Sequence, residues 1–151
     1  MKRLFPLVLL VSLVGFTGCA DKSAGINTTA TAATTQGGYT NVSNTELKDL
    51  LAKKVTLIDI RLPEEWQETG IVAGSKPLTL FEANGQVSKQ FAQTIQQIAP
   101  PDQPVALICR TGNRTQAGAE MLAAAGYKQV YNVTKGIKGW IGDGNPVTPL
   151  K

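Results

Sequence analysis

The chain has 151 residues, which is enough for one ordinary domain but not for two. Its formal net charge is +4, and no basic run carries interleaved aromatic side chains, so the composition favours neither nucleic acid nor an anionic membrane surface as a partner. The chain contains no histidine, which excludes Cys–His and Ser–His–Asp catalysis, and its two cysteines lie far apart in the sequence. We therefore expect no metal site and no cofactor.

The first 18 residues have the pattern of a secretory signal peptide. Lys2 and Arg3 precede an almost unbroken apolar run from Leu4 to Phe16. This run is too short to span a bilayer, because a membrane helix needs about 20 apolar residues. A charged start followed by a short apolar region predicts export, with an uncleaved membrane anchor as the alternative.

The signal ends in FTGCA, which resembles the lipobox of bacterial lipoproteins, although Phe16 stands where that motif usually has leucine. The resemblance implies that Cys19 becomes the lipid-bearing first residue of the exported chain. Ala20 after it is similar to lipoproteins sent to the outer membrane of Gram-negative bacteria. The alternative is an ordinary cleaved signal that leaves the protein free in the periplasm. Residues 19–38, rich in Ala, Thr, Gly and Ser, are predicted to form a flexible tether.

Residues 39–151 show the alternating helix and strand signals of a single α/β domain. Ser43 and Glu46 form a capping-box pattern, short β-branched runs predict buried strands, and periodic apolar residues predict helices. Strands separated by helices predict a parallel sheet covered by helices on both faces. The expected elements are a helix at 44–53, a strand at 55–60, a helix at 63–69, a strand at 76–81, a helix at 87–99, a strand at 104–108, a helix at 113–126, a strand at 129–133 and a helical turn at 135–140.

Charged and reactive side chains follow two of the predicted strands. In an open parallel sheet, ligands bind beyond the carboxyl ends of the strands. Cys109 directly follows the strand at 104–108, and Asp59 and Arg61 lie at the end of the strand at 55–60. Their position alone nominates these three residues for a site.

Cys109 is predicted to be a reactive thiol. If Cys19 carries a lipid, Cys109 has no disulfide partner within the chain. A glycine turn, the amino end of the next helix and two arginines follow it, and each favours the thiolate over the thiol. The same ring of N–H groups would bind an anion. The alternative is a small, buried, inert cysteine at a strand end. The residues expected to surround the sulfur are Arg110, Thr111, Gly112, Asn113 and Arg114.

Two segments, LIDIRLPEEWQETGIVAGS at 57–75 and PVALICRTGNRTQAGAEMLAAAGYKQVYNVTKGIKGW at 104–140, resemble the single-domain rhodaneses, a family of sulfurtransferases. The shared motifs are Asp-x-Arg followed by Pro-Glu-Glu, the Cys-Arg-x-Gly-x-Arg loop, the AGY helix end and the NVTKGIKGW ending. The resemblance covers residues 39–151 and implies a rhodanese-like fold. One motif departs, because the family's GHIPGA appears here as GIVAGS, with Ile71 in place of histidine and Ala73 in place of proline.

The resemblance also implies a reaction. Cys109 would take a sulfane sulfur from a donor such as thiosulfate, carry it as a persulfide and pass it to cyanide or a thiol. Arg110 and Arg114 are the candidates for holding the anionic donor. A protein acceptor is also compatible with this scheme. The residues expected to support the site are Asp59, Arg61 and Thr115.

Two other functions remain open. Tyrosine-phosphatase-like and arsenate-reductase-like enzymes also place a cysteine and an arginine around an oxyanion. Phosphatase loops have five residues between the two, whereas four separate Cys109 from Arg114, and the shorter ring suits a single sulfur atom better than a tetrahedral phosphate. The other alternative is a non-catalytic rhodanese-like binding module, although such modules commonly lose the cysteine.

Two further groups of side chains receive a structural interpretation. Glu64, Glu65 and Glu68 are interpreted as the solvated surface of a helix, with no role in the site. Trp140 would lie either at the rim of the site or in the core, and an aromatic residue near a chain end is more often in the core.

Overall fold

The computed structural model describes residues 34–150, which form a six-stranded sheet and five helices. The strands are β1 (Thr34–Gln36), β2 (Tyr39–Val42), β3 (Thr56–Asp59), β4 (Lys76–Pro77), β5 (Val105–Ile108) and β6 (Val130–Val133). The helices are α1 (Asn44–Ala52), α2 (Pro63–Thr69), α3 (Lys89–Ile98), α4 (Asn113–Ala124) and α5 (Gly136–Gly142). The predicted signal peptide, Cys19 and the tether up to residue 33 lie outside the described residues.

The sheet is parallel except at one edge. Its strand order is β1-β2-β6-β5-β3-β4, and only β1 runs antiparallel to its neighbour. This order places β5, the strand that precedes Cys109, between β6 and β3 in the interior of the sheet. The predicted α/β fold with a parallel sheet is confirmed.

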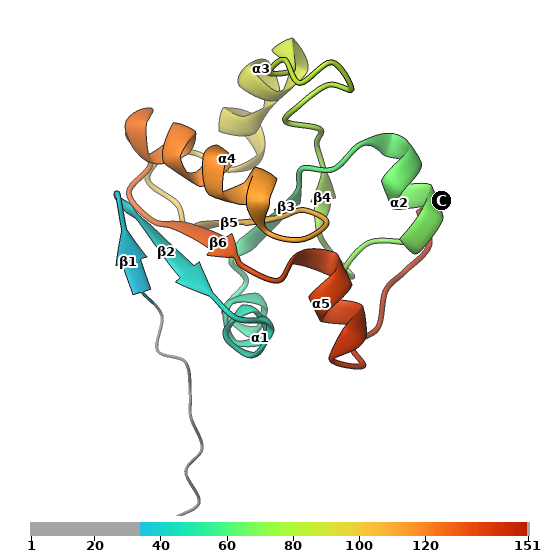
Figure 1. Ribbon diagram of the computed structural model, residues 1–151. Helices are drawn as coiled ribbons and strands as arrows, with labels where there is room; N and C mark the ends of the chain where they lie inside the picture. Colours follow the sequence, from blue (N-terminus) through green and yellow to red (C-terminus); the bar gives the residue numbers. More distant parts are fainter. Residues whose placement is uncertain (1–33, 151) are drawn as a thin grey trace, which may run out of the picture. The chain divides into compact units, whose positions relative to one another are not determined.

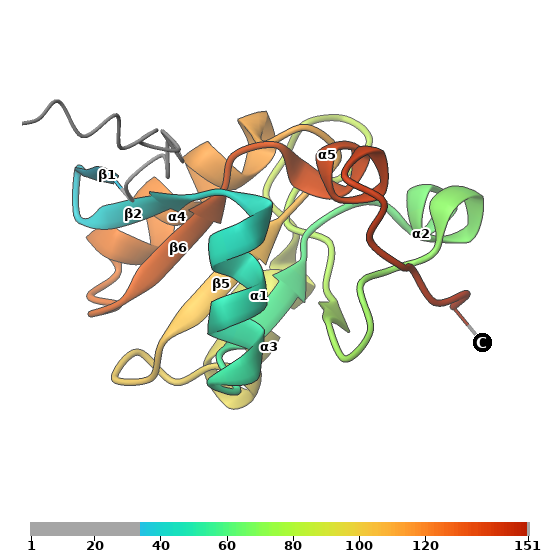
Figure 2. The ribbon, with the colours of Figure 1, turned by 90° about the horizontal axis from the view of Figure 1, so that it is seen from below.

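Helices cover both faces of the sheet. Figure 1 shows α3 and α4 on one face and α1 and α5 on the other, and Figure 2 shows the same arrangement from below. The buried residues of β5 alternate accordingly: Val105 and Leu107 pack in the core under α3 and α4, whereas Ala106 and Ile108 pack in the core under α1 and α5. Among the described residues, none of the helices is long and apolar enough to cross a membrane.

Two helices start where their sequences predict. Ser43 caps α1: its backbone N–H donates to the Glu46 carboxylate at 2.7 Å, and its hydroxyl accepts from the Glu46 N–H at 3.3 Å. Pro63 opens α2, at a position where a missing N–H costs no hydrogen bond. The predicted capping box and the bounds of α2 are confirmed.

The hairpin of β1 and β2 was not predicted. Thr34 pairs with Asn41, and Gly37 and Gly38 form the two-residue turn with φ of +56° and +86°. Both turn residues lie in the left-handed region, as a type I′ hairpin turn requires. The sheet therefore begins inside the segment that the sequence assigned to the tether.

The predicted strand at 76–81 is correct only at its start. β4 ends at Pro77 because its partner β3 ends at Asp59, so the ladder stops there. Beyond it, the Leu78 N–H donates to the Asp59 carbonyl at 3.0 Å, and Leu80 is fully buried. The alternating apolar pattern of this segment thus reflects burial of Leu78 and Leu80 in the core rather than a longer strand.

Candidate functional site

Cys109 lies directly after β5, at the carboxyl edge of the sheet. It continues the alternation of Val105 and Leu107, so its side chain faces the core under α3 and α4. Only 1% of the residue is exposed. The thiol therefore lies beneath the segment that follows it, with bulk water nearly excluded. This segment, residues 109–115 including the first turn of α4, is called the sulfur loop below.

Two groups of the loop contact the sulfur. The Gly112 N–H donates to Cys109 Sγ at 3.2 Å, and Thr115 Oγ1 lies 3.7 Å from Sγ. The Thr115 hydroxyl donates to the Gly112 carbonyl at 2.7 Å. Because a hydroxyl has one proton, it cannot donate to the sulfur at the same time. Gly112 has φ of +100°, and a Cβ there would overlap the carbonyl oxygen of Thr134. Only glycine fits this turn, and its backbone donor is aimed at the sulfur.

Backbone hydrogen bonds join the amino end of α5 to the loop. The Ile137 N–H donates to the Cys109 carbonyl at 2.8 Å, and the Lys138 N–H donates to the Arg110 carbonyl at 3.1 Å. Gly136, with φ of +57°, lets the two segments approach, because a Cβ there would lie 2.5 Å from the Cys109 carbonyl oxygen. The backbone of the loop is therefore fixed by α5 on one side and by α4, which begins at Asn113, on the other.

Arg114 is engaged by a carboxylate of α2. Its Nη1 and Nη2 donate to the two oxygens of Glu65 at 2.7 and 2.6 Å, a bidentate ion pair. Burial acts to raise the pKa of Glu65, but hydrogen bonds from Arg114 and from the Leu62 N–H, with the charges of Arg114 and Arg61, outweigh it and hold this pKa below its usual value. The hydrogen bond to Glu65 in turn raises the pKa of Arg114. The ion pair joins α2 to the start of α4.

Arg110 also faces α2. Its Nη1 lies 3.9 Å from Glu65 Oε1 and 3.7 Å from Glu68 Oε2. The Arg110 side chain is 42% exposed and that of Glu68 is 59% exposed, so this contact is open to solvent. Both loop arginines therefore have carboxylates of α2 as their partners.

Asp59 and Arg61 form a fully buried ion pair with an Nη2–Oδ2 distance of 2.7 Å. Arg61 also donates to the backbone and side chains of α2 and the residue after it. These acceptors are the Glu65 carbonyl, Thr69 Oγ1 and the Gly70 carbonyl. Arg61 thus anchors α2 to the end of β3, and α2 carries the carboxylate that holds Arg114. None of the side-chain hydrogen bonds of this pair goes to residues 109–115.

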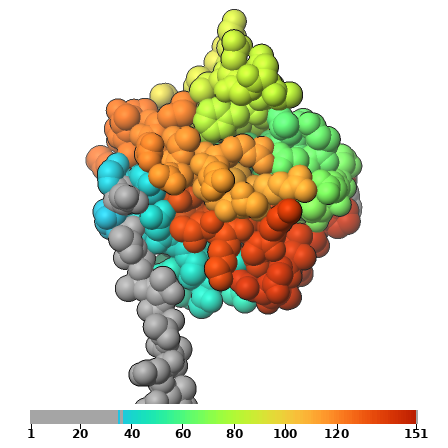
Figure 3. Space-filling view, in the orientation of Figure 1, coloured from blue at the N-terminus to red at the C-terminus, as the bar shows by residue number. Residues whose placement is uncertain are grey.

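The outer part of the loop is accessible. Thr111 and Asn113 are exposed, whereas Gly112 and Thr115 are buried. In Figure 3 the segment before and within α4 (orange) meets the surface between α2 (green) and α5 (red). A small molecule can therefore approach the loop from this face, while the sulfur itself lies beneath it.

The sequence of residues 43–143 matches the family model described as Rhodanese-like domain. The chain belongs to the rhodanese-like domain family. Thiosulfate sulfurtransferase GlpE of Tolumonas auensis is 29% identical over 103 residues, covering 68% of this chain and 88% of that protein. An uncharacterized protein of Rickettsia conorii is 31% identical over 104 residues, covering 66% and 84%. A solved rhodanese-related protein from Thermoplasma volcanium is 28% identical with a TM-score of 0.58, covering 73% of this chain and 98% of that one.

The segment that departs from the rhodanese motif packs against the end of the chain. Ile71, which stands where the motif has histidine, forms an antiparallel bridge with Thr148. The Ile71 N–H donates to the Thr148 carbonyl at 2.9 Å, and the Thr148 N–H donates to the Ile71 carbonyl at 2.8 Å. Backbone pairing therefore fixes this segment. Trp140 is buried in the core under α1 and α5, and its indole N–H donates to the Pro146 carbonyl at 2.8 Å.

Glu65 is the site residue that sequence reasoning missed. It was grouped with Glu64 and Glu68 as a solvated surface, but it is buried and pairs with Arg114, which lies 49 residues away. One local signal was present: its carboxylate also accepts the Leu62 N–H at 3.0 Å, the capping arrangement of a helix start. That signal marks Glu65 as fixed in place, although it does not name Arg114 as the partner.

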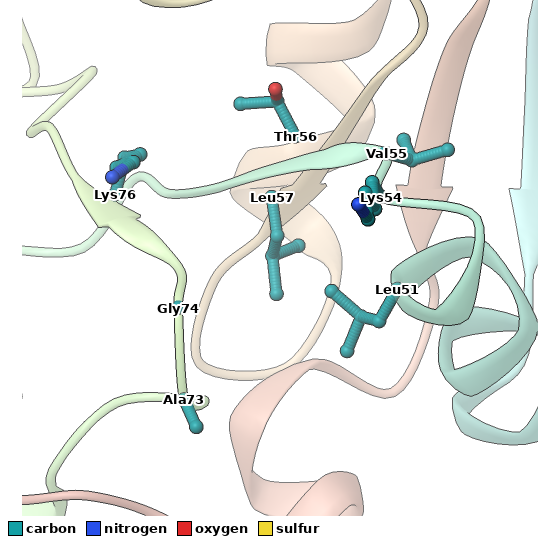
Figure 4. A pocket seen from close by; sticks show the side chains of 8 residues that line it. All are labelled: Leu51, Lys54, Val55, Thr56, Leu57, Ala73, Gly74 and Lys76. Carbon is teal, nitrogen blue, oxygen red and sulfur yellow. The ribbon is translucent and has the colours of Figure 1, made fainter.

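Cys109 lines neither of two cavities found in the described residues. One of them is a depression of about 280 Å³ lined by the end of α1, the start of β3 and residues near β4. Figure 4 shows the eight residues that line it. The depression surrounds Thr56 at the amino end of β3, the edge of the sheet opposite to the sulfur loop. Within residues 34–150, no three Cys, Asp or Glu side chains are placed to share a metal ion. Neither cavity adds a residue to the candidate site, which remains the loop that carries Cys109.

Proposed function

We propose that the protein is a sulfurtransferase that moves a sulfane sulfur from a small anionic donor, such as thiosulfate, to a thiol or cyanide through a persulfide on Cys109. The observation that carries this proposal is the backbone N–H of Gly112, aimed at Sγ at 3.2 Å from a turn that only glycine fits. A fixed N–H donor stabilises negative charge on the sulfur without a histidine base. The similarity to the Tolumonas auensis thiosulfate sulfurtransferase supports the same reaction class.

Each half of the reaction is a displacement at sulfur. The Cys109 thiolate attacks the sulfane sulfur of the donor, a new S–S bond forms, and the bond to the donor's remaining sulfur breaks. With thiosulfate, the electron pair of that bond leaves on sulfite. An acceptor thiolate or cyanide then attacks the outer sulfur of the persulfide, and the electron pair returns to Cys109. The Gly112 N–H stabilises the thiolate at the start and at the end of the cycle, and Thr115 can turn its hydroxyl proton from the Gly112 carbonyl to the sulfur.

The geometry argues against the phosphatase alternative. A phosphate dianion in the loop would need the guanidinium of Arg114, which Glu65 already holds with two hydrogen bonds at 2.7 and 2.6 Å. Four residues separate Cys109 from Arg114, so the ring is also small. A single sulfur atom bound to Cys109 is smaller than a phosphate group, so it needs neither a wide ring nor an arginine without a partner.

We also propose that the protein is an exported lipoprotein. Lys2, Arg3 and the apolar run to Phe16 support export, and the position of Cys19 after small residues supports a lipid at that cysteine. Ala20 favours the outer membrane, where the domain would work on the periplasmic side. Metabolic labelling with a fatty acid tests this: label is expected on the wild-type chain and absent from Cys19→Ser, and label retained by Cys19→Ser would contradict it.

Turnover with thiosulfate and cyanide tests the reaction. The full chain carrying Cys19→Ser has Cys109 as its only thiol and is expected to form thiocyanate, whereas the same chain with Cys109→Ser is expected to form none. Circular dichroism of both proteins shows whether each is folded. Equal thiocyanate formation by the two would overturn the proposal. Hydrolysis of an aryl phosphate that Cys109→Ser abolishes would instead support the phosphatase alternative.

A further inference from the structure

The two arginines of the sulfur loop are both opposed by carboxylates of α2. We infer that Glu65 and Glu68 lower the affinity of the loop for a doubly charged sulfur donor and favour a donor with a single negative charge, such as a thiosulfonate or a thiol persulfide. Glu68 is then a specificity-determining residue. This inference rests on the proposed function and concerns which donor that site accepts.

The contact geometry differs between the two arginines. Both Nη groups of Arg114 donate hydrogen bonds to Glu65, whose negative charge offsets that of the guanidinium. Arg110 is less committed, because its Nη1 lies 3.9 Å from Glu65 and 3.7 Å from Glu68, and it is 42% exposed. Arg110 is therefore the loop cation that an incoming donor can reach, and Glu68 is the exposed carboxylate beside it.

An anion that approaches Arg110 meets the negative charge of Glu68 at the same place. The repulsion between that carboxylate and a donor scales with the donor's charge, so it is about twice as large for thiosulfate as for a singly charged thiosulfonate. Lys135, which directly precedes α5, and Lys138 of α5 are exposed and attract both donors. Neither lysine has an ion-pair partner within the described residues. Their attraction does not depend on Glu68, so removing Glu68 isolates the effect of the carboxylate.

The chemistry of transfer is the same for both donors. With methanethiosulfonate, the Cys109 thiolate forms an S–S bond to the sulfane sulfur, the bond to the sulfonyl sulfur breaks, and the electron pair leaves on methanesulfinate. With thiosulfate the leaving group is sulfite. The two donors differ by one unit of charge, and each transfers its sulfane sulfur to Cys109.

The test compares Glu68→Gln with a matched control, Glu64→Gln. Glu64 lies on the same helix, carries the same charge, is exposed and takes part in none of the ion pairs of the described residues. Thiocyanate formation from thiosulfate and from methanethiosulfonate, with cyanide as acceptor, gives kcat/KM for each donor. The assays contain salt at about 0.1 M, which screens charges that lie more than about 10 Å apart and so limits the effect of distant charges on the donors.

Glu68→Gln is expected to raise kcat/KM for thiosulfate about threefold, mainly through a lower KM, and to raise it less than twofold for methanethiosulfonate. Glu64→Gln is expected to change neither value by more than about 1.5-fold. The inference is overturned if Glu68→Gln leaves the ratio of the two donors unchanged, or if Glu64→Gln shifts this ratio equally. If the wild-type chain transfers sulfur from neither donor, the proposed function fails as well, which distinguishes the two failures.

Discussion

Replacing Arg61 with methionine is expected to lower the free energy of unfolding by about 3 to 5 kcal/mol, because it leaves the Asp59 carboxylate buried without its partner. Asp59 is fully buried, and the guanidinium lies 2.7 Å from its Oδ2. The substitution also removes the donors to the Glu65 and Gly70 carbonyls at 2.9 and 2.8 Å. Methionine keeps most of the volume of the side chain, so the loss reports the charge and the hydrogen bonds rather than a cavity.

Urea unfolding followed by circular dichroism measures this change. With an m-value of about 2 kcal/mol/M, a loss of 3 to 5 kcal/mol moves the midpoint down by roughly 1.5 to 2.5 M. The double variant Asp59→Asn with Arg61→Met should recover part of the loss, because the buried charge is gone. A loss below about 1 kcal/mol for Arg61→Met, or a double variant less stable than Arg61→Met alone, would refute the reasoning.

Two further predictions concern the loop and its partner helix. Gly112→Ala is expected to cost more than 2 kcal/mol and at least tenfold in sulfur transfer, because its Cβ overlaps the Thr134 carbonyl; Gly126→Ala, with similar φ and open space, should cost about 1 kcal/mol and leave transfer unchanged. Glu65→Gln is expected to lower stability by about 1 to 3 kcal/mol near pH 7, since it weakens the pair with Arg114. The folded pKa of Glu65 lies below its unfolded value of 4.5, so this difference is full above that pH and vanishes as the pH falls through the folded pKa.

Each of these predictions has a result that would contradict it. Equal losses of stability and transfer in Gly112→Ala and Gly126→Ala would show that positive φ alone matters and that the contact with Thr134 does not. For Glu65→Gln, unfolding curves measured at several pH values should converge with those of the wild type in acid. A stability difference that persists unchanged into acid would mean that the charge of Glu65 is not what stabilises the fold.

The starts of α1 and α2 were predictable from the sequence because their signals are local. The capping box of Ser43 and Glu46 and the proline that opens α2 each act within one helical turn. The turn of the β1–β2 hairpin was also local, since Gly37 and Gly38 are a known hairpin signal. The residues before it resemble the tether in composition, and composition alone therefore assigns the turn to the tether.

The electrostatics of the site were not predictable in the same way. Cys109 and its glycine turn follow from a continuous stretch of sequence, but the partner of Arg114 lies 49 residues away on α2. The capping position of Glu65 marks it as fixed at the helix start, but nothing in this run of acidic residues indicates that Glu65 pairs with Arg114. That choice depends on how Arg61 anchors α2 beside the loop, and hence on the packed fold.

The mass of the Cys109 peptide after incubation with thiosulfate tests the central claim most directly. The full chain with Cys19→Ser, exposed to thiosulfate and then freed of excess donor, is expected to gain the mass of one sulfur atom on that peptide. Cyanide should remove this mass and release an equal amount of thiocyanate. An unchanged Cys109 peptide in a folded protein, or a gained sulfur that cyanide and thiols cannot remove, would contradict the account.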